Sequence, residues 1–208
     1  MPFSSCFAYL PDGTGPLCDE GRLLCARLKS ADPIWLPRLI TRVWSQAVGQ
    51  GRFGPSLGSR VVLVPVPGSA AGHDAHWVGE RLALCLQQVG LAAQVWPVLH
   101  RRWAVRKSAF CAAGARPSVL EHYASFVVEP PPRNGAAAGL PLTLIDDVIT
   151  RGRTLLAAAC RLREAYPQAQ VRAFVLLRTL ARNEALLQVF DPCAGEVRWA
   201  EGDARRRP

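Results

Sequence analysis

Residues 142–154 read Leu-Thr-Leu-Ile-Asp-Asp-Val-Ile-Thr-Arg-Gly-Arg-Thr, and this stretch constrains the fold more than any other part of the chain. A short apolar run ends in two adjacent acids, and a turn with a glycine then leads into an Ala- and Leu-rich segment typical of a helix. Open α/β sheets bind ligands at such strand ends. The free N–H groups of a helix start suit phosphate. The order of parts predicts a polyol held by carboxylates and a phosphate held by backbone amides.

The remaining chain alternates apolar runs with amphipathic stretches, and no internal repeat interrupts the alternation. We expect strands at 61–66, 95–99, 125–128, 142–146 and 171–177, and helices at 20–29, 36–47, 76–89 and 152–165. We expect residues 1–19 to be irregular and the chain after 180 to be weakly structured, with a strand near 197–200. The alternation predicts an α/β fold with an open, mainly parallel sheet flanked by helices on both faces.

The size of the chain fits one packed domain, because 208 residues with 50% hydrophobic content can build a single core. The predicted organisation is one domain over 1–208, with an N-terminal helical or hood segment at 1–58, a core at 59–180 and a C-terminal segment at 181–208. No run approaches about 18 apolar residues, so we expect no membrane partner. The first residues lack a basic region followed by an apolar core, so we expect no signal peptide.

Charge and cysteine content limit the kinds of ligand and the cell compartment that fit this chain. The net charge is +9, and arginine carries almost all of it because Lys29 and Lys107 are the only lysines. Such a field attracts an anionic metabolite or a nucleic acid without choosing between them, and a general bias toward arginine explains it equally well. The terminal Arg205-Arg206-Arg207 is expected to be a solvated tail. Seven scattered cysteines without a Cys-x-x-Cys pair indicate reduced thiols, a cytoplasmic location and no zinc.

Residues 142–154 resemble the ribose-phosphate loop of the type I phosphoribosyltransferases. The resemblance implies that Asp146 and Asp147 hold the ribose hydroxyls of phosphoribosyl pyrophosphate (PRPP). It also implies a 5′-phosphate site made of Thr150, Arg151, Gly152, Arg153 and Thr154. The chain departs from the family at Arg151, where Thr or Ser is usual, and at Arg153, where Ala is frequent. A strand with a polar end before an N-capped helix is the plain alternative.

Two local expectations follow from this assignment. Both acids should face the ligand, which requires the chain to curl because neighbouring strand residues normally point to opposite faces. Gly152 should be present because a backbone this close to an anion leaves no room for a Cβ, so Gly152→Val should lower stability only slightly. The side chains of Arg151 and Arg153 would add charge to the phosphate or face solvent.

A second strand ends in Val64-Pro65-Val66-Pro67-Gly68-Ser69. The prolines stiffen the turn and Gly68 permits unusual dihedral angles, which also describes an ordinary rigid strand exit. This sequence resembles the pyrophosphate loop of the ComF-like, competence-associated members of the same family. That resemblance implies pyrophosphate binding by Pro67, Gly68, Ser69 and Ala70. Shortly afterwards, His73, Asp74 and His76 read as a metal cluster or as a helix N-cap at Asp74 between surface histidines.

Residues 101–108 form the densest basic segment. In type I enzymes a mobile loop near this place closes over the substrate, and the resemblance implies that its cations are Arg102, Arg106 and Lys107. Cations interleaved with Trp103 also suit single-stranded DNA, through phosphate contact and base stacking. A solvated loop is the plain alternative.

Over residues 23–180 the chain loosely resembles the ComF-like members, without their N-terminal zinc element. The resemblance implies a PRPP-binding phosphoribosyltransferase, a glycosyltransferase that moves ribosyl-5-phosphate to a nitrogenous acceptor and releases pyrophosphate. Mg²⁺ would be held mainly by the substrate, with no protein ligand assigned. The alternative is a non-catalytic protein that binds PRPP or a nucleotide and acts in DNA uptake or regulation. A homodimer is compatible with either reading.

Overall fold

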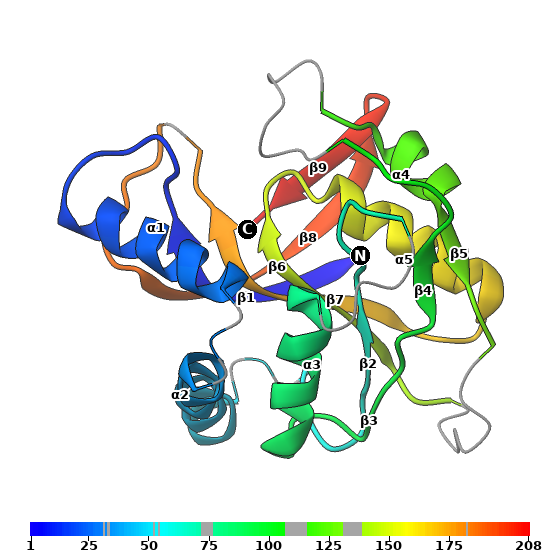
Figure 1. Ribbon diagram of the computed structural model, residues 1–208, viewed down its shortest axis with the longest axis horizontal. Helices are drawn as coiled ribbons and strands as arrows, with labels where there is room; N and C mark the ends of the chain where they lie inside the picture. The colour runs from blue at the N-terminus through cyan, green and yellow to red at the C-terminus, as the bar shows by residue number, and fades with distance from the viewer. Residues whose placement is uncertain are drawn as a thin grey trace.

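The computed structural model describes residues 1–30, 32, 34–51, 53, 55–71, 77–106, 116–130, 139–181 and 183–208. Its centre is a seven-stranded sheet in the order β3-β2-β6-β7-β1-β8-β9 (Figure 1). The strands of this sheet are β1 Pro2–Tyr9, β2 Val62–Pro65, β3 Gln94–Val95, β6 Leu142–Ile149, β7 Val171–Thr179, β8 Phe190–Ala200 and β9 Asp203–Arg207. A separate antiparallel ribbon pairs β4 Leu99–Arg101 with β5 Phe126–Val128. The helices are α1 Pro16–Lys29, α2 Trp35–Gln50, α3 Val78–Gln88, α4 Val119–Ser125 and α5 Arg153–Ala165.

The sheet is parallel over five strands, from β3 through β2, β6 and β7 to β1. The C-terminal hairpin of β8 and β9 then extends it in antiparallel pairing against β1. The prediction of an α/β fold with a mainly parallel sheet flanked by helices is confirmed at this level. None of the helices in the described ranges is long and apolar enough to cross a membrane.

Both faces of the sheet are buried. Along β2, Val62 and Val64 point into one core and Leu63 into the other, as the two-residue period of a strand requires. The first core contains α5, α4 and the β4–β5 ribbon, whereas the second contains α1, α2 and α3 (Figure 1). A parallel sheet needs this cover on both faces, which explains the unbroken apolar runs of its central strands.

The chain order creates a switch point between β2 and β6. From β2 the chain runs through α3 to β3 on one side, and from β6 it runs through α5 to β7 on the other. Because α3 and α5 cover opposite faces, the loops that leave β2 and β6 diverge at the carboxyl edge. Open α/β sheets bind their ligands in the crevice that such divergence leaves.

Both ends of the chain differ from the prediction. Residues 2–9, expected to be irregular, form β1 between β7 and β8, and the buried Ser4 and Ser5 disguise this strand as a loop. The expected solvated tail is β9, where the guanidinium of Arg206 donates to the carbonyl oxygens of Ile149 (3.3 Å) and Thr179 (2.5 Å). The sheet therefore extends into both segments that flank the predicted 59–180 core.

Candidate functional site

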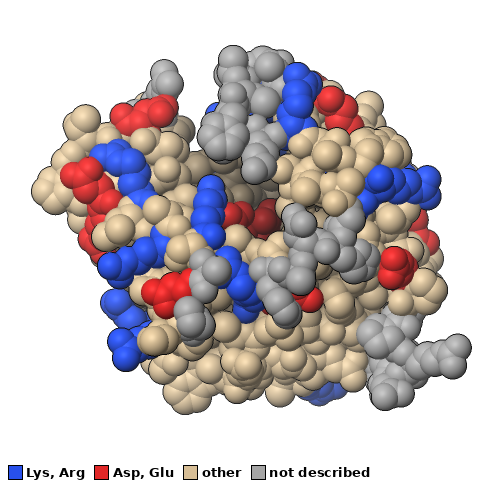
Figure 2. All heavy atoms as spheres, in the orientation of Figure 1, with Lys and Arg blue, Asp and Glu red and all other residues tan. Residues whose placement is uncertain are grey.

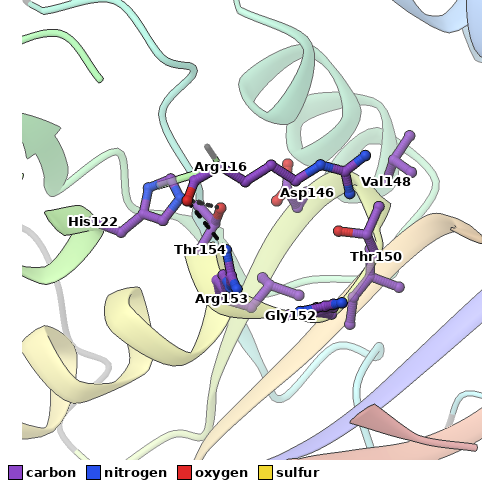
Figure 3. A pocket seen from close by; sticks show the side chains of 11 residues that line it. Arg116, His122, Asp146, Val148, Thr150, Gly152, Arg153 and Thr154 are labelled. Atoms are coloured by element: carbon purple, nitrogen blue, oxygen red, sulfur yellow. Dashed lines mark hydrogen bonds between the residues drawn. The ribbon is translucent and has the colours of Figure 1, made fainter. Parts of the chain in front are cut away.

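A solvent-open concavity of about 410 Å³ lies where β6 ends and α5 begins (Figure 3). It contains the whole 150–154 loop that the sequence predicted. The lining residues are Arg116, His122, Asp146, Val148, Ile149, Thr150, Arg151, Gly152, Arg153, Thr154 and Leu155. Figure 2 shows acidic side-chain atoms at the bottom of a hollow near the centre of the displayed face, with Lys or Arg side chains beside it. The fold thus places an acid and a helix N-terminus in one pocket.

The two predicted acids occupy different positions. Asp146 lines the pocket, whereas Asp147 does not, and the charge of Asp147 reaches the Cys25 thiol on α1 and helps to raise its pKa. The pKa of Asp146 lies well above its usual range, because burial penalises its charge and Asp147 adds repulsion. The two residues stay connected, since the Asp147 amide donates to Asp146 Oδ1 at 2.9 Å. Engagement of both acids by one ligand stays a prediction.

Gly152 is required by the protein itself. Its φ of +85° is left-handed, and it is the N-cap of α5. A Cβ built there would lie 2.8 Å from both methyl carbons of Val197 on β8. The expectation that the anion alone demands this glycine, and that a larger residue would lower stability only slightly, is therefore wrong.

The start of α5 leaves backbone donors free of the helix. The first intrahelical bond runs from the Leu156 amide to the Gly152 carbonyl at 2.9 Å. The N–H groups of Arg153, Thr154 and Leu155 therefore have no acceptor within the helix. They lie at the positive end of a 13-residue helix, and all three residues line the pocket. This combination is suited to an anion.

Arg153 does not offer its side chain to the pocket. Its Nε and Nη2 each donate to a carboxylate oxygen of Asp203 on β9 at 2.6 Å. Its Nη1 donates to the carbonyl oxygens of Arg116 and Pro117, each at 3.2 Å. The pairing lowers the pKa of Asp203 to about 2. Arg151 contacts the same carboxylate at 3.3 Å but is 56% exposed, so it is the cation of this loop that a ligand can reach.

Arg116 is a lining residue that sequence reasoning did not assign to the site. In Figure 3 its side chain extends across the pocket toward Asp146 and Val148. Its Nε is buried and makes no hydrogen bond to the part of the chain that the structure describes. Arg153 fixes its backbone through the Arg116 carbonyl. Only the tertiary fold brings this residue to the pocket, 37 positions before the arginine that holds it.

The 67–70 loop lies at the end of β2, beside β6, because the Val66 amide donates to the Ile145 carbonyl at 2.9 Å. None of its four described residues lines the pocket. Gly68 does not use the left-handed φ that a glycine permits. A Cβ built on it would meet nothing within 4 Å. The protein's own packing therefore permits a side chain at this position.

Arg101 and His122 connect the two loops. Arg101 is 4% exposed, and its Nε donates to the Gly68 carbonyl at 2.5 Å. Its Nη2 lies 3.2 Å from His122 Nδ1, and His122 Nε2 lies 3.3 Å from Thr154 Oγ1. Burial, with a smaller contribution from Arg101, lowers the pKa of His122 to about 4. A buried chain of contacts thus runs from the 67–70 loop to the pocket.

The predicted mobile-loop cations are only partly described. Arg102 and Arg106 are exposed, and Arg106 contacts Glu121 at 3.5 Å. The Val105 amide donates to the Ser69 carbonyl at 2.8 Å, so this segment lies against the 67–70 loop. Lys107, His73, Asp74 and His76 lie outside the described residues.

Metal and thiol chemistry can be stated for the described part of the chain. Within it, no three His, Cys, Asp or Glu side chains gather into a group that could hold a metal ion. The described cysteines are free thiols, and they are Cys6, Cys18, Cys25, Cys85, Cys160 and Cys193. Burial raises the pKa of Cys6 well above the usual range, so this thiol stays protonated at neutral pH.

The chain was compared with known proteins. Neither a scan against protein-family models nor a search of the curated proteins finds a match.

Proposed function

We propose that this protein binds PRPP and transfers its ribosyl-5-phosphate group to a nitrogenous acceptor with release of pyrophosphate. The observation that carries the proposal is the pocket that joins Asp146 to the 150–154 loop at the start of α5. A carboxylate accepts hydrogen bonds from ribose hydroxyls, and free amides at a helix start donate to a phosphate. PRPP carries both groups on one sugar.

The proposed reaction breaks the bond between ribose C1 and the pyrophosphate oxygen, and a nitrogen lone pair forms the new bond to C1. Holding the ribose and the 5′-phosphate fixes C1 relative to both reactants. Arg102 and Arg106 are exposed cations on the segment whose Val105 amide contacts the 67–70 loop, on the side proposed for the departing pyrophosphate. They act on it electrostatically.

Mg²⁺ belongs to the proposal through its hard oxygen donors. The oxygens of PRPP are the ligand type that Mg²⁺ prefers, so the substrate would hold the ion, and no protein ligand is assigned. When bound, the ion would neutralise charge on the leaving pyrophosphate.

A specific observation favours the alternative, a non-catalytic PRPP- or nucleotide-binding protein. The described lining of the pocket contains no Phe, Tyr or Trp on which an acceptor base could stack. Trp103, by contrast, is 49% exposed and lies next to the exposed Arg102. Cations beside an exposed aromatic ring suit single-stranded DNA, which would fit a role in DNA uptake.

A pyrophosphate-release assay separates the two functions. The full chain is mixed with PRPP, Mg²⁺ and a panel of purines, pyrimidines and ammonia, with the Asp146→Asn/Asp147→Asn variant as control. Release above the hydrolysis background with any acceptor, and none with the folded variant, supports the transferase. Flat traces together with PRPP binding favour the binding protein, and absence of PRPP binding rejects both.

A further inference from the structure

We propose that His122 is a positioning residue: as a neutral ring held by Arg101, it directs the Thr154 hydroxyl to donate its proton to the bound phosphate. This inference rests on the proposed function only in assigning a phosphate group to the pocket. The ring and its two partners are seen in the structure independently of that assignment.

The direction of each hydrogen bond follows from the chemistry of the three groups. A guanidinium has donors only, so Arg101 Nη2 donates to His122 Nδ1, which must carry a lone pair. In a neutral ring the proton is then on Nε2, and Nε2 donates to Thr154 Oγ1 at 3.3 Å. The opposite direction would place an Nδ1 proton against the guanidinium, so that two donors would face each other.

Thr154 is left with a proton to donate. Its Oγ1 accepts from His122, and no other hydrogen bond involves this hydroxyl among the described residues. Thr154 is the second residue of α5 and lines the pocket, where Figure 3 shows it beside His122. Its hydroxyl therefore adds a side-chain donor to the free amides of the helix start, and a phosphate oxygen is the matching acceptor.

The surroundings keep the ring in this state. Arg101 is fixed by the Gly68 carbonyl, by Ser125 Oγ, and by the ring of Phe126, whose centroid lies 4.1 Å from Arg101 Cζ. His122 itself is 3% exposed and stacks on the same Phe126 ring.

The charged groups that face His122 do not raise its pKa enough for the ring to be protonated at neutral pH. They are Arg101 on β4, Arg153 on α5 and Glu121 on its own helix α4. Burial and the two arginines lower the pKa of His122 to about 4, and Glu121 opposes them only in part.

Nitrogen-15 NMR of the full chain without ligand reads the ring directly. We expect His122 to show an unprotonated Nδ1 and a protonated Nε2 at pH 7, with no titration between pH 5 and pH 8. An Nδ1–H tautomer or a charged ring at pH 7 would overturn the inference. Because no ligand is added, this result does not depend on the proposed function.

Two amide substitutions separate the two ring nitrogens. The amide of His122→Gln reaches the position of Nε2 and can still donate to Thr154, whereas His122→Asn places its oxygen near Nδ1 and retains only the contact with Arg101. With ribose-5-phosphate as the probe in calorimetry, we expect His122→Gln to stay within about threefold of the wild type. We expect His122→Asn and Thr154→Val each to weaken binding by roughly tenfold, the usual effect of one hydrogen bond to a charged group.

Combining His122→Asn with Thr154→Val gives the sharpest test. We expect no further loss beyond Thr154→Val alone, because His122 acts through this hydroxyl. Additive losses, or unchanged affinity in folded His122→Asn, would overturn the inference while the proposed function stands. If the wild type binds no ribose-5-phosphate at all, the proposed function and this role of Thr154 fail together, and the NMR result still reports the tautomer.

Discussion

The loops that follow β2 and β6 occupy equivalent places in the sheet but are held in different ways. The 150–154 loop has a left-handed glycine packed on Val197 and an arginine clamped by Asp203. The 67–70 loop has a glycine with ordinary φ and open space around it, and protein donors reach it through two carbonyl oxygens, those of Gly68 and Ser69. Contacts with the rest of the protein therefore constrain the 150–154 loop more than the 67–70 loop.

This difference teaches how the site is pre-organised. The C-terminal hairpin braces the 150–154 loop from behind, through Val197, Asp203 and Arg206. A loop that already has its bound shape loses less entropy when an anion binds. In the 67–70 loop, by contrast, the space beside Gly68 is open, so a ligand can approach the backbone there. Substitutions in the two loops should therefore separate stability from binding.

The largest expected effect is that of Gly152→Ala. The new Cβ meets Val197 at 2.8 Å and the residue must keep a left-handed φ, so we expect the free energy of unfolding to fall by roughly 2–4 kcal/mol. Urea denaturation measures it. Adding Val197→Ala should recover part of the loss, because it removes the contact but not the backbone strain. A Gly152→Ala protein as stable as the wild type would show that neither the contact with Val197 nor the left-handed φ constrains this position.

Breaking the clamp should have the next largest effect. Asp203→Asn and Arg153→Gln should each lower stability by about 1–2 kcal/mol, since the pair is bidentate and partly buried. The folded pKa of Asp203, about 2, lies below its ordinary value, so the stabilisation is complete above about pH 4 and is lost as pH falls toward 2. Thermal unfolding across this range checks it. Arg151→Gln is the matched control and should change little, because Arg151 is 56% exposed.

Asp146→Asn should raise stability while it removes binding. Burial places the folded pKa of Asp146 well above its unfolded value, so the folded state holds a proton more strongly and stability falls as pH rises through that window. Replacing the acid removes this penalty at neutral pH. A gain of about 1 kcal/mol would raise the Tm by roughly 2–4 °C.

The neighbouring Asp147→Asn is the comparison for that experiment and should give a smaller gain, because it removes the repulsion from Asp147 but leaves Asp146 buried. Thermal unfolding at pH 5 and pH 8 should show the advantage of Asp146→Asn growing with pH. A fall in Tm on Asp146→Asn would mean that the carboxylate stabilises the fold and that burial of its charge is not destabilising.

The smallest effect on stability is expected for Gly68→Ala. The added methyl meets nothing within 4 Å and the backbone needs no left-handed φ, so the change should stay within about 0.5 kcal/mol. Titration with pyrophosphate and Mg²⁺ should nevertheless show weaker binding. Unchanged pyrophosphate affinity would remove the 67–70 loop from the proposed site and leave the 150–154 loop as its one supported anion site.

The sequence predicts the parts of this molecule in which neighbouring residues carry the signal. The apolar run, the acids and the glycine turn at 142–154 lie together in the chain, and the structure brings Asp146 and the whole loop to one pocket. The helices α3 and α5 and the strands β2, β5, β6 and β7 follow from their periodicity, although β6 continues to Ile149, three residues beyond the expected end. The strand expected at 95–99 is wrong, because β3 ends at Val95 and β4 begins at Leu99, and α4 was not predicted. The acids lie inside the strand and therefore follow its alternation.

The remaining features depend on contacts between distant segments. β1 contains the buried Ser4 and Ser5, whose polarity conceals a central strand. The role of Gly152 depends on Val197, 45 positions later, and His122 reaches Thr154 across 32 positions. No local pattern marks these contacts, because the fold alone decides which side chains meet.

Calorimetric titration of the full chain with PRPP and Mg²⁺, beside Asp146→Asn and ribose-5-phosphate, tests whether the pocket formed by Asp146 and the 150–154 loop binds PRPP. We expect one PRPP site per chain, weaker binding of ribose-5-phosphate at the same site, and loss of PRPP binding in the folded Asp146→Asn variant. Absence of PRPP binding by the wild type, or equal binding by Asp146→Asn, would contradict this assignment.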